Sequence, residues 1–128
     1  MKKILIAGIA ITFLIACGSK GSKEGTKDDT QTSTTDITQD PVYQKGLGLL
    51  AKSDCLTCHK IEDVVTGPSY RSVANKYSGF PDSIVTHLAN KIIQGGSGVW
   101  GQVAMTPHPA ISQEDAEAMV SYILLLKK

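Results

Sequence analysis

The stretch Cys55-Leu56-Thr57-Cys58-His59 is the most informative part of this 128-residue chain. Two thiols three residues apart can each add to one vinyl group of the same porphyrin, and the histidine that follows can then reach the iron. This C-x-x-C-H pattern is the signature of covalent haem attachment. It predicts one covalent haem c held by Cys55 and Cys58, with His59 as the proximal iron ligand.

Three other interpretations of the motif stay open at this point. A redox-active C-x-x-C is expected beside a β-α-β pattern, which the sequence lacks. A zinc site could use Cys55, Cys58 and His59, but it needs a fourth ligand. Adjacent residues such as Cys58 and His59 also seldom both reach one metal well. A chance occurrence of the motif is the third alternative.

Composition excludes several classes of function. The chain has 13 Lys and Arg against 12 Asp and Glu, and this balance argues against nucleic acid or an acidic lipid surface as the partner. Aromatic residues make up only 5% of the chain, so a large apolar cofactor would help to fill the interior. Cys17 lies far from Cys55 and Cys58, and the three cysteines therefore do not form a disulfide framework.

Residues 1–16 are predicted to be a lipoprotein signal peptide. Two lysines precede an apolar run of 13 residues, Ile4 to Ala16, whereas a helix that spans a bilayer needs about 20. The run therefore indicates an export signal. Its end, Leu14-Ile15-Ala16-Cys17, resembles the lipobox of bacterial lipoproteins, which implies cleavage before Cys17 and lipidation of Cys17. An uncleaved anchor, or an ordinary signal peptide with an incidental cysteine, stays open.

Residues 17–40 are predicted to be the lipidated cysteine and a flexible tether, because Gly, Ser, Thr, Lys and Asp dominate them. Residues 41–128 form the folded domain. Helical spacing predicts four helices, at about 41–53, 69–77 and 82–94 and after Ser112. The predicted N-caps include Asp40 before Pro41, and Ser112. No strand pattern is visible, so the domain is predicted to be all-α.

Each long helix has an expected apolar face. In the first helix the apolar positions are Val42, Leu47, Leu49, Leu50 and Ala51. In the third they are Ile84, Val85, Leu88, Ile92 and Ile93. In the last they are Ala116, Met119, Val120, Ile123 and Leu124. Gly46 and Gly48 weaken the first helix intrinsically, and close approach of another helix or of the cofactor would explain them.

Met105 is the predicted sixth iron ligand. It lies in a loop stiffened by Pro107 and Pro109, where a thioether can be held against iron. Met119 is most simply a core residue. His87, within the third helix, is expected to be solvated or to serve as a cap.

The domain from Pro41 to Lys128 resembles the short bacterial class I cytochromes c of the c-551 type. The matching segments are Cys55–His59, Gly67-Pro68-Ser69-Tyr70, Ile92-Ile93-Gln94-Gly95-Gly96, Gly98-Val99-Trp100-Gly101, Met105-Thr106-Pro107 and Asp115 to Leu125. The ordered run of G-V-W-G and M-x-P is far more specific than C-x-x-C-H alone. The resemblance implies a class I cytochrome c fold of about four helices wrapped around one covalently bound haem.

The resemblance also implies roles for individual residues. His59 and Met105 would be the axial ligands, and the carbonyl of Pro68 would accept a hydrogen bond from His59. Trp100 would lie beside a haem propionate and donate its indole N–H. Ordinary core packing of Trp100 and an ordinary turn at Gly67-Pro68 stay open as alternatives. The chain departs from the family at His108, where an asparagine often lies near the methionine sulfur.

A histidine and a methionine together saturate the iron, which favours electron transfer over catalysis. We therefore expect a monomeric electron carrier, not an enzyme, that meets respiratory redox partners through a weak, transient interface. It is expected to be exported to the cell envelope. There the lipid on Cys17 would hold it on a membrane facing the periplasm or the cell exterior. Two alternatives stay open: a haem protein with a labile Met105 that binds peroxide or a small gas, and a fixed relay in a respiratory complex.

Overall fold

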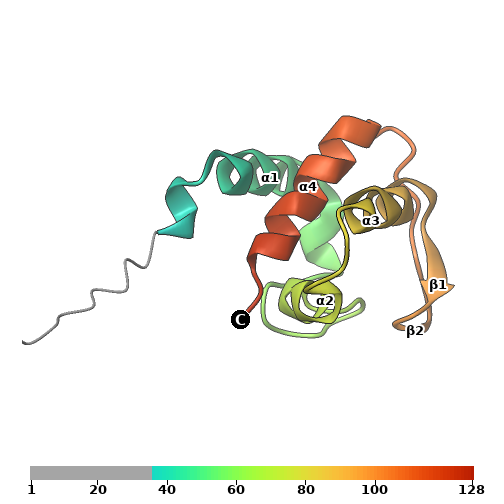
Figure 1. Ribbon diagram of the computed structural model, residues 1–128. Coiled ribbons are helices and arrows are strands. Elements are labelled where there is room, and N and C mark those ends of the chain that lie inside the picture. Colours follow the sequence, from blue (N-terminus) through green and yellow to red (C-terminus); the bar gives the residue numbers. More distant parts are fainter. Residues whose placement is uncertain (1–35) are drawn as a thin grey trace, which may run out of the picture. The chain divides into compact units, whose positions relative to one another are not determined.

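The computed structural model describes residues 36–128 (Figure 1). The signal peptide, Cys17 and most of the expected tether lie outside the described residues. The elements are the 3-10 turns η1 (Ile37–Gln39) and η2 (Asp54–Thr57), the helices α1 (Pro41–Lys52), α2 (Tyr70–Tyr77), α3 (Ser83–Gln94) and α4 (Gln113–Leu125), and the strands β1 (Gly96–Gly98) and β2 (Gly101–Met105). In residues 36–128, no helix is both long and apolar enough to cross a membrane.

Three of the four α-helices in residues 36–128 begin at side-chain caps. The Asp40 carboxylate accepts the amide N–H two residues along the chain, at 2.7 Å. The hydroxyls of Ser69 and Ser112 each accept the N–H three residues along, at 3.1 Å. These bonds satisfy amides that have no partner within the first helical turn. The helix after Asp82 has no side-chain cap bond, and it ends at Gly95, whose φ is +69°.

Helix α4 packs against each of the other three helices, and in Figure 1 it crosses α1 and runs beside α3. Apolar residues cover more than one side of α4, which explains why this helix can pack against three others. The buried cluster consists of Leu50, Tyr70, Ala74, Ala89, Ile92, Ala116, Met119, Val120, Tyr122, Ile123 and Leu126. The predicted core role of Met119 is confirmed, since its exposed fraction is 2%. Tyr122 is just as deeply buried, although the sequence did not single it out.

Helices α1 and α4 approach closely at Gly46. A Cβ atom at this position would lie 2.2 Å from the Cβ of Tyr122 and 2.7 Å from the carbonyl oxygen of Ala118. A side chain would therefore force the two helices apart, which confirms the prediction that another helix explains Gly46. The same explanation is wrong for Gly48, because a Cβ there would have no protein atom within 4 Å.

The inward face of α1 differs from the predicted one at both ends. Val42 is 43% exposed and Ala51 is also exposed. Tyr43 packs instead, with its ring centroid 4.9 Å from that of Tyr122. The contact at Gly46 sets the rotation of the helix, and residues 42 and 51 lie at the margins of the resulting face.

The all-α class is confirmed, but the segment expected to be a plain loop contains a short hairpin. Strands β1 and β2 are antiparallel and pair Gly96 with Met105 and Gly98 with Gly101. Gly96, Gly98 and Gly101 have φ between +108° and +127°, a region in which L side chains are strained. This hairpin depends on the conformational freedom of glycine, and it lacks the apolar alternation that marks a strand in a sequence. The expectation of no strand was therefore wrong.

Candidate functional site

The C-x-x-C-H motif folds as a tight turn around η2. The N–H groups of Cys58 and His59 both donate to the carbonyl oxygen of Cys55, at 3.2 and 3.0 Å. Both cysteines are free; Cys55 is partly buried against the core and Cys58 is exposed. Burial raises the pKa of the Cys55 thiol. The motif in residues 36–128 is followed by helices and a two-stranded hairpin, and not by the β-α-β unit expected beside a redox-active C-x-x-C.

The imidazole of His59 is oriented by the segment that follows the motif. Its Nδ1 lies 2.7 Å from the carbonyl oxygen of Pro68 and donates to it, which leaves Nε2 available as a ligand. The N–H of Gly67 donates to the carbonyl of Cys58 at 2.9 Å. A Cβ at Gly67 would lie 2.4 Å from Cε1 of His59. Gly67 and Pro68 are therefore part of the histidine's support and not an ordinary turn.

Tyr70 also supports His59, a contact that sequence reasoning did not identify. The two rings are stacked, with centroids 5.3 Å apart and an interplanar angle of 14°. Tyr70 is buried, and desolvation raises the pKa of its phenol well above the usual range. The position of Tyr70 directly after the helix cap Ser69 was the only sign of it in the sequence. That position does not predict that the ring would stack on His59.

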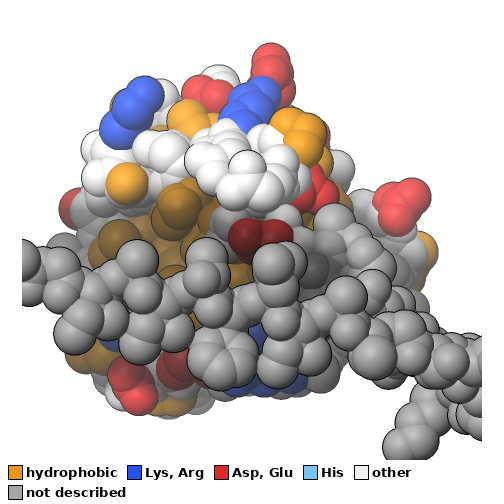
Figure 2. Space-filling model, turned by 90° about the vertical axis from the view of Figure 1, so that its left-hand side faces the viewer, with side chains coloured by type: hydrophobic (Ala, Val, Ile, Leu, Met, Phe, Trp, Pro, Cys, Tyr) orange, Lys and Arg blue, Asp and Glu red, His pale blue; other side chains and the backbone are white. Residues whose placement is uncertain are grey.

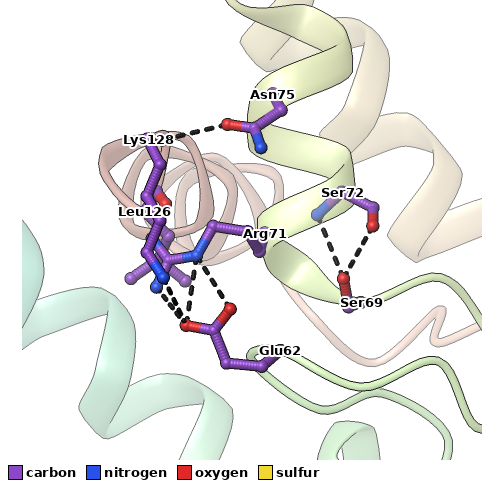
Figure 3. A network of polar contacts seen from close by, with 7 residues as sticks. All are labelled: Glu62, Ser69, Arg71, Ser72, Asn75, Leu126 and Lys128. Atoms are coloured by element: carbon purple, nitrogen blue, oxygen red, sulfur yellow. Dashed lines mark hydrogen bonds and ion pairs between the residues drawn. The ribbon is translucent and has the colours of Figure 1, made fainter.

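A polar network fastens the loop between His59 and Tyr70 to the carboxyl end of the chain (Figure 3). The guanidinium of Arg71 donates to both carboxylate oxygens of Glu62 and to the carbonyl of Leu126. Hydrogen bonding to Arg71 lowers the pKa of Glu62. The N–H of Lys128 donates to the side chain of Asn75 at 3.0 Å. This network holds both ends of the loop that presents Pro68 to His59.

Met105 lies at the end of β2, where the glycines of the hairpin place it. A Cβ at Gly95 would lie 2.4 Å from the carbonyl oxygen of Met105, so only glycine allows this approach of β2 to the end of α3. Met105 is partly buried and packs against the same core as Cys55. His87, by contrast, is exposed on α3, as expected for a solvated residue.

Trp100 lies at the tip of the hairpin and is 45% exposed, so ordinary core packing is not its role. The ammonium of Lys76 lies 5.4 Å from the centroid of the indole ring, within range of a cation–π interaction. Nε2 of His108 lies 3.0 Å from Oδ1 of Asp54, and sequence reasoning did not identify Asp54.

The residues present fit a large apolar prosthetic group. Among residues 36–128, seven of the ten exposed large apolar residues belong either to the segment that begins at the motif or to the hairpin before Met105: Leu56, Ile61, Val64, Val65, Val99, Trp100 and Val103. Exposed apolar residues gathered in two such segments are typical of a binding surface. The donor set does not fit zinc, since residues 36–128 contain no cluster of three or more His, Cys, Asp or Glu able to hold a metal ion.

A C-x-x-C-H turn, an oriented histidine and a helical domain together define a c-type haem protein. Comparison with known proteins agrees with this class. The family model described as "Cytochrome c" matches residues 43–127, and the chain belongs to the cytochrome c family.

Among its relatives is cytochrome c-552 of Nitrosomonas europaea, 43% identical over 84 residues, which cover 66% of this chain and 81% of the relative. Cytochrome c-551 of Allochromatium vinosum is 39% identical over 90 residues, covering 70% and 95%. The crystal structure of wild-type Nitrosomonas europaea cytochrome c552 matches with a TM-score of 0.59 and 43% identity, covering 63% of this chain and 99% of that one. The chain is accordingly a small class I cytochrome of the c-551 type. It binds one haem c covalently and is an electron carrier, not an enzyme.

Proposed function

We propose that this chain is an exported, membrane-anchored monohaem cytochrome c that shuttles single electrons between respiratory redox partners. Cys55 and Cys58 hold the haem through thioethers, and His59 and Met105 are the axial ligands of its iron. The observation that carries the proposal is the hydrogen bond from His59 Nδ1 to Pro68 at 2.7 Å. It fixes the tautomer and ring orientation that leave Nε2 for iron.

The protein's own residues set the conditions for electron transfer. When bound, the haem supplies a one-electron couple, and a thioether ligand raises its potential relative to a second imidazole. Gly67, Pro68 and Tyr70 hold the His59 ring from two sides, so the ligand need not reorganise when the charge changes. Trp100, on the exposed tip of the hairpin, is proposed to donate its indole N–H to a haem propionate.

The partner surface is proposed to be small and apolar. Val99 and Val103 of the hairpin are 62% and 67% exposed, and Val64 is 70% exposed. On the side of the domain away from the hairpin, the described residues that Figure 2 shows carry charged side chains of both signs, with no field of one sign. The exposed valines support a weak, transient encounter of a monomer, and the mixed charges do not favour attachment to nucleic acid.

The first experiment is the absorption spectrum of the haem-loaded domain in both oxidation states, produced in a host that attaches haem c. We expect sharp low-spin bands in the reduced protein and a weak far-red sulfur-to-iron transition in the oxidised one. An oxidised high-spin spectrum without this transition would instead favour peroxide or gas binding at an open iron. Absence of covalent haem would refute the assignment of Cys55 and Cys58.

Membrane attachment is proposed to occur through lipid on Cys17. The supporting observations are the lipobox-like Leu14-Ile15-Ala16-Cys17 and an apolar run of 13 residues, which is too short for a good membrane span. Two or more acyl chains hold a protein on a membrane stably.

Substitution Cys17→Ser is expected to release the cytochrome from the membrane. In a bacterial host, the wild type should fractionate with membranes and need detergent for extraction. The variant is given a cleavable export signal in place of residues 1–16, because loss of Cys17 also removes the lipobox cleavage site. It should then appear in the soluble exported fraction with an unchanged haem spectrum, because residue 17 precedes the haem domain. Retention of this variant on the membrane would show that lipid on Cys17 is not the anchor.

A further inference from the structure

His108 makes a side-chain contact that links the Met105 segment to the haem-attachment turn. Its Nε2 lies 3.0 Å from Oδ1 of Asp54, although the two residues are 54 positions apart. A carboxylate only accepts hydrogen bonds, so the histidine donates from Nε2. The His108 side chain is 21% exposed and that of Asp54 79%. The donor end of the pair is therefore sheltered from water, while the acceptor faces it.

The backbone of His108 is held as well. Its N–H lies 3.1 Å from the carbonyl oxygen of Ile92 and 3.2 Å from that of Ile93, at the end of α3. The other ring nitrogen, Nδ1, is buried and has no hydrogen-bond partner among residues 36–128. A buried polar atom without a partner costs free energy. The ring adopts the orientation that contacts Asp54, although only one of its two nitrogens then has a hydrogen-bond partner.

We propose that His108 is a positioning residue for Met105. Asp54 directly precedes Cys55, and His108 follows Met105 by three residues. The hydrogen bond between them ties together the two segments that carry the attachment site and the sixth ligand. Movement of the Met105 segment away from η2 would break this bond, so the bond restrains a movement that would carry the thioether away from the iron. The inference rests on the proposed function, in which Met105 is an iron ligand.

The test measures the Kd of imidazole for the ferric iron of the haem-loaded full-length protein. Displacement of Met105 by imidazole is observed as loss of the far-red band. His108→Phe keeps the ring but removes the donor, and Asp54→Ala removes the acceptor. We expect each to lower the imidazole Kd by about three- to tenfold, as for the loss of one hydrogen bond. The double variant should show no further decrease, since both substitutions remove the same contact.

Two variants serve as controls. His108→Gln can still donate to Asp54 from its amide nitrogen and should stay close to the wild type. Asp63→Ala removes an equal charge from an exposed position near the motif and should leave the imidazole Kd unchanged. This comparison separates the specific contact from a general change in surface charge.

The outcomes distinguish this inference from the proposed function. A far-red band in the wild type, with the same imidazole Kd in every variant, would overturn the positioning role and leave the function standing. Lower unfolding midpoints without a change in imidazole Kd would also overturn it, because they would show only a structural contact. A wild type without the far-red band would refute Met105 ligation, and the inference with it.

Discussion

Replacement of Met105 by alanine is expected to abolish the far-red sulfur-to-iron transition of the oxidised protein while the haem stays covalently attached. Cys55 lies in η2 and Cys58 directly follows it, and the substitution does not touch them. Loss of the thioether opens the sixth position, so the oxidised spectrum should become high-spin. The reduction potential should fall, because a thioether favours ferrous iron. Imidazole should bind at least about tenfold more tightly, since its internal competitor is gone.

Met119→Leu is the matched control for this prediction. Met119 is 2% exposed and belongs to the core, and exchange of methionine for leucine in a core usually costs less than about 1.5 kcal/mol. The control should keep the far-red band and the wild-type potential. Persistence of the far-red band in Met105→Ala would contradict the assignment of Met105 as a ligand. Loss of the band in Met119→Leu would indicate that Met119 is the iron ligand.

Substitution Gly46→Ala is expected to destabilise the holoprotein by about 2 kcal/mol or more, although alanine is the better helix former. The new Cβ would lie 2.2 Å from the Cβ of Tyr122 and 2.7 Å from the backbone oxygen of Ala118. A backbone oxygen cannot rotate away, so α1 and α4 must separate. The measurement is guanidinium unfolding of the haem-loaded protein, followed by far-ultraviolet circular dichroism.

Gly48→Ala provides the comparison within the same helix. A Cβ at this position would meet no protein atom within 4 Å, so the substitution should stabilise the helix by about 0.5–1 kcal/mol. The two variants differ only in what the added methyl group meets. Equal stability of Gly46→Ala and Gly48→Ala would show that α1 and α4 can accommodate a methyl group at position 46, against this prediction.

Local signals in the sequence were sufficient for most of the secondary structure. Caps at Asp40, Ser69 and Ser112 and the glycine at position 95 act within a few residues, so the starts and ends of the helices could be predicted. The hairpin could not, because its strands depend on positive φ angles at glycines and not on apolar alternation. The rotation of α1 was also missed at Val42, since a tertiary contact sets it.

By itself, the sequence determined the class of this protein: Cys55, Cys58 and His59 are adjacent in the chain, so their joint chemistry follows from spacing alone. It also identified Met105 as a candidate ligand, which stays a prediction. Only the tertiary structure decided what surrounds these residues. The stacking of Tyr70 on His59 and the pairing of His108 with Asp54 each join segments whose approach depends on how the helices pack. Contacts between residues far apart in the sequence arise from the packing of the whole domain, so local spacing cannot predict them.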